Sequence, residues 1–96
     1  MNREEVLKLL KKNSPALKRL GVNSLALFGS TARNEATTSS DVDIMVVFKS
    51  SPTFDQYTDT RFYLEDLLGS KVDLVTQEGL RPLVRAEVEK EAIYVA

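Results

Sequence analysis

The hydrophobic positions of this chain recur with two different periods, which predicts an alternation of helices and strands. Apolar residues at helical spacing begin near the N-terminus and predict a first helix through about Lys12, opened by a capping box of Asn2 and Glu5. A second, short helix is predicted with Ser14 as its N-cap and Gly21 just beyond its end. Both helices carry an apolar side and are expected to be packing elements.

Three apolar runs predict strands. The first covers residues 24–28 and the second residues 42–48, while the third covers about residues 71–75. The second run has apolar residues on both faces, which is typical of a central strand that is covered on both sides. Residues 93–95 are expected to add a short edge strand.

Two more helices complete the predicted elements. One begins near Ser51 and stops at Gly69, with these apolar residues near helical spacing: Phe54, Tyr57, Leu64 and Leu68. The other runs from about Leu80 to Glu91 and is expected to use three residues for packing: Leu83, Val84 and Val88.

The composition limits the chemistry. Ninety-six residues with 43% hydrophobic content predict one compact domain, residues 1–96, with a modest core and only one wall of an active-site cleft. The sequence has no cysteine and no histidine, which excludes disulfides, thiolate chemistry and an imidazole base, and argues against zinc. Carboxylates remain as strong ligands, and oxygen ligands favour Mg²⁺, Mn²⁺ or Ca²⁺.

The charge balance limits the partners. A net charge of −1 and a pI of about 5.4 argue against duplex nucleic acid as a main partner. Basic residues gather near the N-terminus, but the solvated face of a helix explains them: Lys8, Lys11, Lys12, Lys18 and Arg19. No apolar run approaches the roughly 18 residues of a membrane span, so we expect a soluble, cytoplasmic protein without membrane contact.

A Gly-Ser pair follows the first predicted strand. Gly29 and Ser30 form a sharp turn that opens a helical turn through Arg33, and such a turn leaves backbone N–H groups free. Free N–H groups at a helix start bind phosphate. Arg33 can add a charged contact, although a surface salt bridge or loop packing explains it equally well.

Three aspartates form the second candidate feature. Asp41 and Asp43 begin the second strand ten residues after Ser30, and strand geometry places them on one face with Cα atoms roughly 6.7 Å apart. Two carboxylates at about 4 Å repel by roughly 4 kcal/mol at an effective dielectric of 20, a cost that a divalent cation removes. Asp73 joins them if the third strand lies beside the second. The open alternative is that each is an ordinary aspartate that faces solvent.

Together these residues resemble a known family. Gly29-Ser30, Asp41-Val42-Asp43 and Asp73 look like the signature of the polymerase-β-type nucleotidyltransferases. The resemblance covers nearly the whole chain. Within this superfamily, the chain most specifically resembles the minimal nucleotidyltransferases, the MntA-like group. One departure is Asn34, where the group commonly has Gly; Asn tolerates the left-handed conformation, so the turn is expected to survive.

The resemblance implies an α/β (α+β) fold with a small mixed sheet flanked by helices, and transfer of AMP from ATP. It implies that Asp41 and Asp43 bridge two Mg²⁺ ions, with Mn²⁺ as a substitute, about 3.5 to 4 Å apart. Asp73 completes the second metal site and is the best candidate to accept the acceptor's proton. Nucleotide binding falls to Gly29, Ser30 and Arg33.

The resemblance also implies a partner. Members commonly act as antitoxins to an all-helical HEPN-type ribonuclease, with adenylylation of a tyrosine of that toxin. Two alternatives stay open: an antitoxin that neutralises its partner by binding without catalysis, and a nucleotidyltransferase that acts on RNA or a small molecule. Retention of all three acids argues against the first, and the absence of a second domain to hold the acceptor argues against the other.

Overall fold

The computed structural model describes residues 2–95, in which four strands form one mixed sheet in the order β3-β2-β1-β4. The strands are β1 (Val22–Phe28), β2 (Val42–Phe48), β3 (Val72–Thr76) and β4 (Ile93–Tyr94). β1 pairs antiparallel with both β2 and β4, whereas β3 pairs parallel with β2. The expectation of a small mixed sheet with a central second strand is confirmed.

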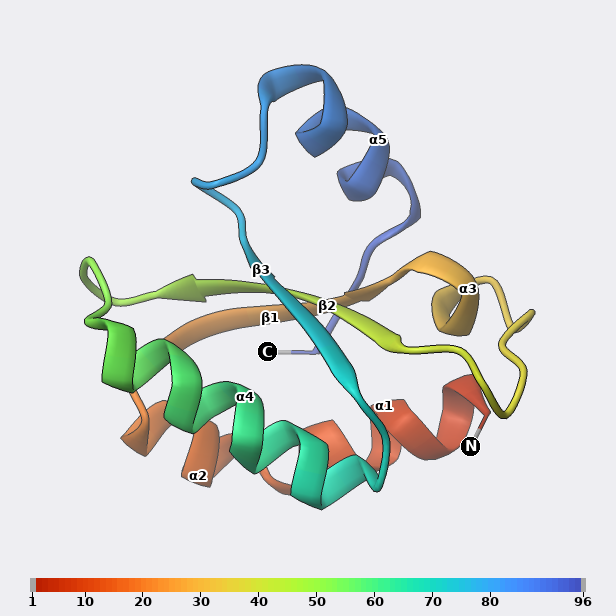
Figure 1. Ribbon diagram of the computed structural model, residues 1–96, viewed down its shortest axis with the longest axis horizontal. Helices are drawn as coiled ribbons and strands as arrows, with labels where there is room; N and C mark the ends of the chain where they lie inside the picture. Colours follow the sequence, from red (N-terminus) through yellow and green to blue (C-terminus); the bar gives the residue numbers. More distant parts are fainter. Residues whose placement is uncertain (1, 96) are drawn as a thin grey trace.

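Helices cover the two faces of the sheet unequally (Figure 1). α1 (Arg3–Lys12), α2 (Ser14–Arg19) and α4 (Phe54–Leu68) lie on one face, and α5 (Pro82–Glu91) lies on the other. α3 (Gly29–Ala32) is a single turn that directly follows β1. None of the helices described within residues 2–95 is long and apolar enough to cross a membrane.

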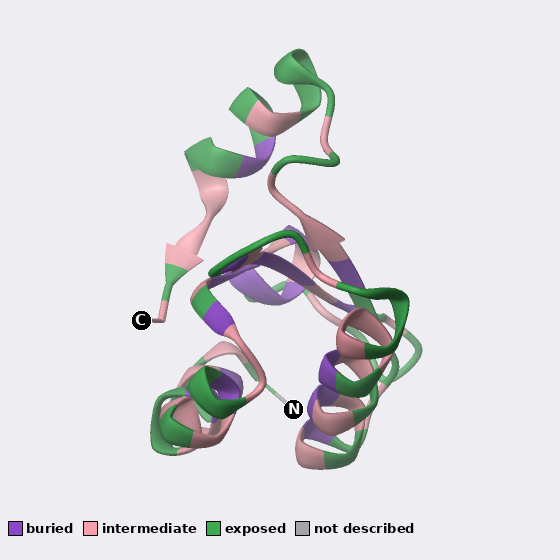
Figure 2. Ribbon diagram, turned by 90° about the vertical axis from the view of Figure 1, so that its left-hand side faces the viewer, coloured by how far each residue is buried: buried purple, intermediate pink, exposed green. Residues whose placement is uncertain are grey.

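Strand alternation divides the core into a large and a small half. Leu27 of β1 and Ile44 of β2 point to the three-helix face and are fully buried there among residues of α1, α2 and α4. Ala26 and Met45 point to the opposite face, where Val88 of α5 packs on them. The rest of α5 is largely exposed (Figure 2). One face of the sheet is therefore well covered, and the other is covered in part.

Several local predictions are confirmed. Asn2 and Glu5 form the reciprocal hydrogen bonds of a capping box at the start of α1. Gly69 ends α4 in the left-handed conformation with φ of 65°. Asn34 also adopts a positive φ, 60°, as expected of the residue that replaces a glycine there.

Element boundaries differ from the prediction by one to three residues. β1 begins at Val22 because Val22 pairs with Phe48 at the far end of β2. The N-cap of α2 is Asn13 and not Ser14, since the chain passes directly from the last turn of α1 into α2. α4 begins at Phe54 because the hydroxyl of Thr53 accepts the N–H of Gln56.

The packing predicted for two helices is wrong in part. Leu83 and Val84 of α5 are 84% and 48% exposed, because α5 meets the sheet through Val88, near its C-terminal end. Phe54 is 75% exposed at the first position of α4, and Tyr57 takes the inward place one turn later. Helical periodicity indicated the apolar residues but not which of them a neighbouring element covers.

Candidate active site

The Gly29 turn lies against an acidic side chain. Phe28, the last residue of β1, pairs with Asp43 of β2, and Gly29 starts α3 with φ of 73°. A Cβ atom on Gly29 would lie 2.0 Å from Oδ2 of Asp43. Any other residue would therefore collide with this carboxylate in a backbone conformation that already favours glycine. The glycine lets the turn and the carboxylate approach each other.

Asp43 and Asp73 are neighbours across the sheet. β2 and β3 run parallel with Asp43 directly paired with Asp73. Since side chains alternate along a strand, Asp43 shares the face of Met45, which is the face that α5 covers in part. Asp73 shares the face of Val75 by the same rule. The sequence predicts that Asp73 joins the other aspartates only if the third strand lies beside the second, and this pairing is present. The two carboxylates point to the same open end of the sheet.

The environment of Asp43 disfavours its ionised form. Burial, and then the nearby charges of Asp73 and Asp41, together raise the pKa of Asp43 from 3.8 to about 6. The guanidinium of Arg33 lowers this pKa, but less than the acids raise it. Negative potential at Asp43 is therefore only partly compensated by the protein's own cations.

The three aspartates do not form one closed set of ligands. Within residues 2–95, no group of three His, Cys, Asp or Glu side chains is arranged to hold a metal ion. Asp41 precedes β2 at an exposed position, so strand pairing does not fix its side chain. The carboxylates of Asp43 and Asp73 nevertheless fit a hard divalent cation in donor chemistry, since they are oxygen ligands whose negative charge Arg33 compensates only in part.

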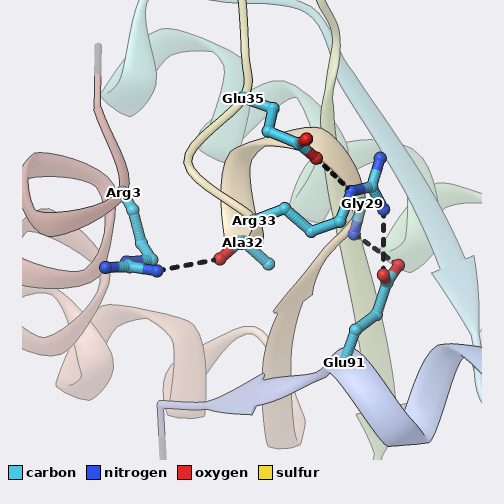
Figure 3. A network of polar contacts seen from close by, with 6 residues as sticks. All are labelled: Arg3, Gly29, Ala32, Arg33, Glu35 and Glu91. Atoms are coloured by element: carbon cyan, nitrogen blue, oxygen red, sulfur yellow. Dashed lines mark hydrogen bonds and ion pairs between the residues drawn. The ribbon is translucent and has the colours of Figure 1, made fainter.

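Arg33 is held by two glutamates (Figure 3). Its Nε donates to Glu35 at 2.7 Å and its Nη1 to Glu91 at 2.8 Å. These hydrogen bonds, the one to Glu35 first, raise the pKa of Arg33 above its usual value. The surface ion pair that the sequence left open for Arg33 is thus present. Its contact with phosphate stays a prediction, as do the roles of Gly29 and Ser30.

Sequence reasoning missed the part that Glu91 plays. Oε1 of Glu91 accepts the backbone N–H of Gly29 at 3.0 Å, while Oε2 accepts Arg33 (Figure 3). Glu91 is 62 residues from Gly29, and no motif or spacing connects the two. Only the return of α5 and β4 towards β1 brings them together.

A groove adjoins the Gly29 turn. It has a volume of about 410 Å³ and lies between the end of β1 and α5, with these lining residues: Phe28, Gly29, Leu83, Val84, Glu87, Val88 and Glu91. The size of the chain predicted only one wall of a cleft. α5 lines this groove beside Gly29, and the expectation that another molecule completes an active-site cleft stays a prediction.

The comparison with known families agrees with this arrangement. Residues 4–95 match the family described as "Nucleotidyltransferase domain". The chain belongs to this family. The family resemblance inferred from Gly29-Ser30 and the aspartates is thereby confirmed, as is the fold class.

Individual members of the family are similar to this chain over most of its length. The chain is 39% identical over 93 residues to "Protein adenylyltransferase MntA" of Thermococcus cleftensis, with 96% of this chain and 94% of that protein covered. It also resembles a solved structure described as a candidate minimal nucleotidyltransferase, with a TM-score of 0.83, 37% identity and coverage of 97% and 95%. A crystal structure of a mutant MntA toxin–antitoxin complex gives a TM-score of 0.68 at 25% identity, covering all of this chain and 72% of the other.

Proposed function

We propose that this nucleotidyltransferase transfers AMP from ATP to a protein hydroxyl, a tyrosine of a HEPN-type toxin, and so acts as the antitoxin of a pair. One observation carries the proposal. The Asp43 and Asp73 carboxylates lie side by side at the open end of the sheet, and Asp43 touches the Gly29 turn. Groups that suit a metal-bound triphosphate therefore adjoin a turn that suits its phosphates.

The residues divide the chemistry between them. Asp41, Asp43 and Asp73 would hold Mg²⁺ or Mn²⁺. When bound, the metal would neutralise part of the negative charge of the triphosphate. The turn at Gly29 lets backbone approach the phosphates, and Ser30 donates its N–H and hydroxyl to the β- or γ-phosphate. Arg33 adds a cation once it turns from its glutamates to phosphate.

The transfer itself is an in-line substitution. The acceptor oxygen attacks the α-phosphorus and the bond from that phosphorus to the bridging oxygen breaks, so pyrophosphate leaves. Asp73 is the proposed base that accepts the acceptor's proton, since it is exposed at the site and the sequence contains no histidine.

A protein acceptor is supported by relatives. MntA of Thermococcus cleftensis is named a protein adenylyltransferase, and an MntA chain of the same fold occurs in a toxin–antitoxin complex. The exposed Leu83 and Val84 beside the groove are also suited to contact with another protein. Because one small domain holds an acceptor weakly, a partner that places its hydroxyl about 3 to 3.5 Å from the α-phosphate accelerates the transfer.

The test requires a candidate partner, which we define as a small helical protein with an Arg-x4-His-x-Tyr motif and which is sought in the reading frame adjacent to that of this chain. The two proteins are incubated with ATP and Mg²⁺, and the partner is analysed by mass spectrometry. We expect one or more AMP increments on the motif tyrosine. Asp43→Asn should abolish them, whereas Asp59→Asn on the exposed side of α4 should not.

Other outcomes select the alternatives. A partner that is inhibited but unmodified would favour an antitoxin that acts by binding alone. Label from α-³²P-ATP that appears in RNA or a small molecule, and not in the partner, would contradict the choice of a protein acceptor.

A further inference from the structure

Glu91 occupies a position that suits an anionic ligand. Its carboxylate accepts one hydrogen bond from the Gly29 N–H at 3.0 Å and one from Arg33 Nη1 at 2.8 Å. A carboxylate held between a backbone N–H and a guanidinium has the same donors that a phosphate group would use here. Glu91 comes from the last turn of α5, so the contact joins this helix to the turn that follows β1.

A phosphate oxygen and Glu91 compete for the Gly29 N–H, because a backbone N–H makes one strong hydrogen bond. Arg33 directs Nε to Glu35 and Nη1 to Glu91, so a phosphate that uses its other N–H groups shares the guanidinium charge with both carboxylates. The side chain of Glu91 is 32% exposed, so it can leave the turn for solvent without crossing the core. Binding of phosphate at Gly29 therefore requires that Glu91 withdraw.

We propose that Glu91 is an internal competitor that sets the affinity of this site for the nucleoside triphosphate. The inference rests on the proposed function, because it concerns the same phosphate turn. In the free protein the Glu91 carboxylate holds Gly29 and Arg33. When nucleotide binds, a phosphate replaces the carboxylate, Arg33 is released to the ligand, and the tie between α5 and the turn is lost.

Charge makes this competition selective. Arg33 shares its single positive charge with Glu35 and Glu91, and Asp43 lies directly against Gly29. An anion without a cation would have to displace one carboxylate among several others. A triphosphate that carries Mg²⁺ brings positive charge, so the aspartates that remain beside Gly29 disfavour it less than they disfavour free phosphate or pyrophosphate.

The test compares nucleotide binding by the whole chain and three variants. Dissociation constants for AMP-PNP with Mg²⁺ are measured by calorimetry, and folding is checked by circular dichroism. Glu91→Gln weakens the hold on Arg33, and we expect about tenfold tighter binding, the size of effect that one charge-assisted hydrogen bond supports. Glu91→Asp keeps the charge but shortens the side chain, and should also bind more tightly.

Glu87→Gln is the matched control. Glu87 lines the same groove one turn earlier on α5, but its ion pair is with Lys90 and not with the turn. It should change the dissociation constant less than about twofold, within the small effect of an exposed charge. A Glu87→Gln variant that gains as much as Glu91→Gln would show a general charge effect and overturn the inference.

Failure of the inference differs from failure of the proposed function. If the wild-type chain binds AMP-PNP and the two Glu91 variants bind equally or more weakly, Glu91 supports the turn and does not compete with ligand. If neither wild type nor variants bind nucleotide, the proposed function falls, and the inference with it. A merely structural role would lower the unfolding free energy without tightening binding, so melting curves of the same variants complete the comparison.

Discussion

Removing the charge of Asp43 should stabilise the protein in the absence of ligand. A pKa of about 6 in place of 3.8 means that the folded state disfavours the ionised carboxylate. The difference corresponds to an upper limit of about 3 kcal/mol of destabilisation at neutral pH. Because the carboxylate is partly exposed, solvent screening reduces this to about 1 to 2 kcal/mol. Asp43→Asn removes the charge and keeps the volume, so it should recover that free energy.

The effect depends on pH with a definite sign. Between about pH 4 and pH 6 the folded state keeps a proton on Asp43 that the unfolded chain has lost, so the wild-type stability falls as the pH rises. The cost is absent below about pH 4 and fully present above about pH 6. The advantage of Asp43→Asn should therefore be near zero at pH 3.8 and complete at pH 7.5.

Urea denaturation at these two pH values measures the difference. Wild type, Asp43→Asn and the control Asp59→Asn are compared in buffer with EDTA. For a chain of this size, each kcal/mol shifts the melting temperature by about 4 to 8 °C, so thermal melts provide a second readout. No gain at pH 7.5, or an equal gain at both pH values, would refute the argument that burial and the neighbouring acids disfavour the ionised Asp43 carboxylate.

Three further predictions concern the turn and its ligand. Gly29→Ala should lower the unfolding free energy by at least about 1 to 3 kcal/mol, and by more than Gly69→Ala, which has a similar φ but no atom within 4 Å of its Cβ; urea titrations compare the two. Ser30→Ala should reduce nucleotide transfer about 10- to 100-fold, the loss of one charge-assisted hydrogen bond, as measured by initial rates. ATP with Mg²⁺ at 100 times its dissociation constant should raise the unfolding free energy by about 2.7 kcal/mol, and melts without a shift at millimolar ligand would contradict the site.

Local signals in the sequence were sufficient for much of the fold. The capping box at Asn2, the left-handed stop at Gly69 and the bounds of β2 follow from residues that act on their immediate neighbours. The turn at Gly29 and the aspartates of β2 were found in the same way, since each lies at the end of an apolar run. The same residues were sufficient to identify the family.

Long-range features were beyond the sequence alone. The sequence could not predict that Asp43 pairs with Asp73, because the spacing of strands along a chain does not specify which strands become neighbours. Glu91 was missed as a partner of Gly29 for the same reason. The exposure of Leu83 likewise depends on where α5 lies on the sheet, which helical periodicity does not specify.

The incomplete cover that α5 provides leaves the candidate site accessible. A helix of ten residues is about 15 Å long, and a strand of seven residues such as β2 extends for about 23 Å. α5 covers Met45 through Val88 and leaves the end of the face at Asp43 and Asp73 open. On the opposite face three helices bury the core, so the stability that they provide offsets the repulsion between the carboxylates. The same short helix that fails to bury Leu83 thus leaves room for a ligand beside Gly29 and sends Glu91 to the turn that the ligand would use.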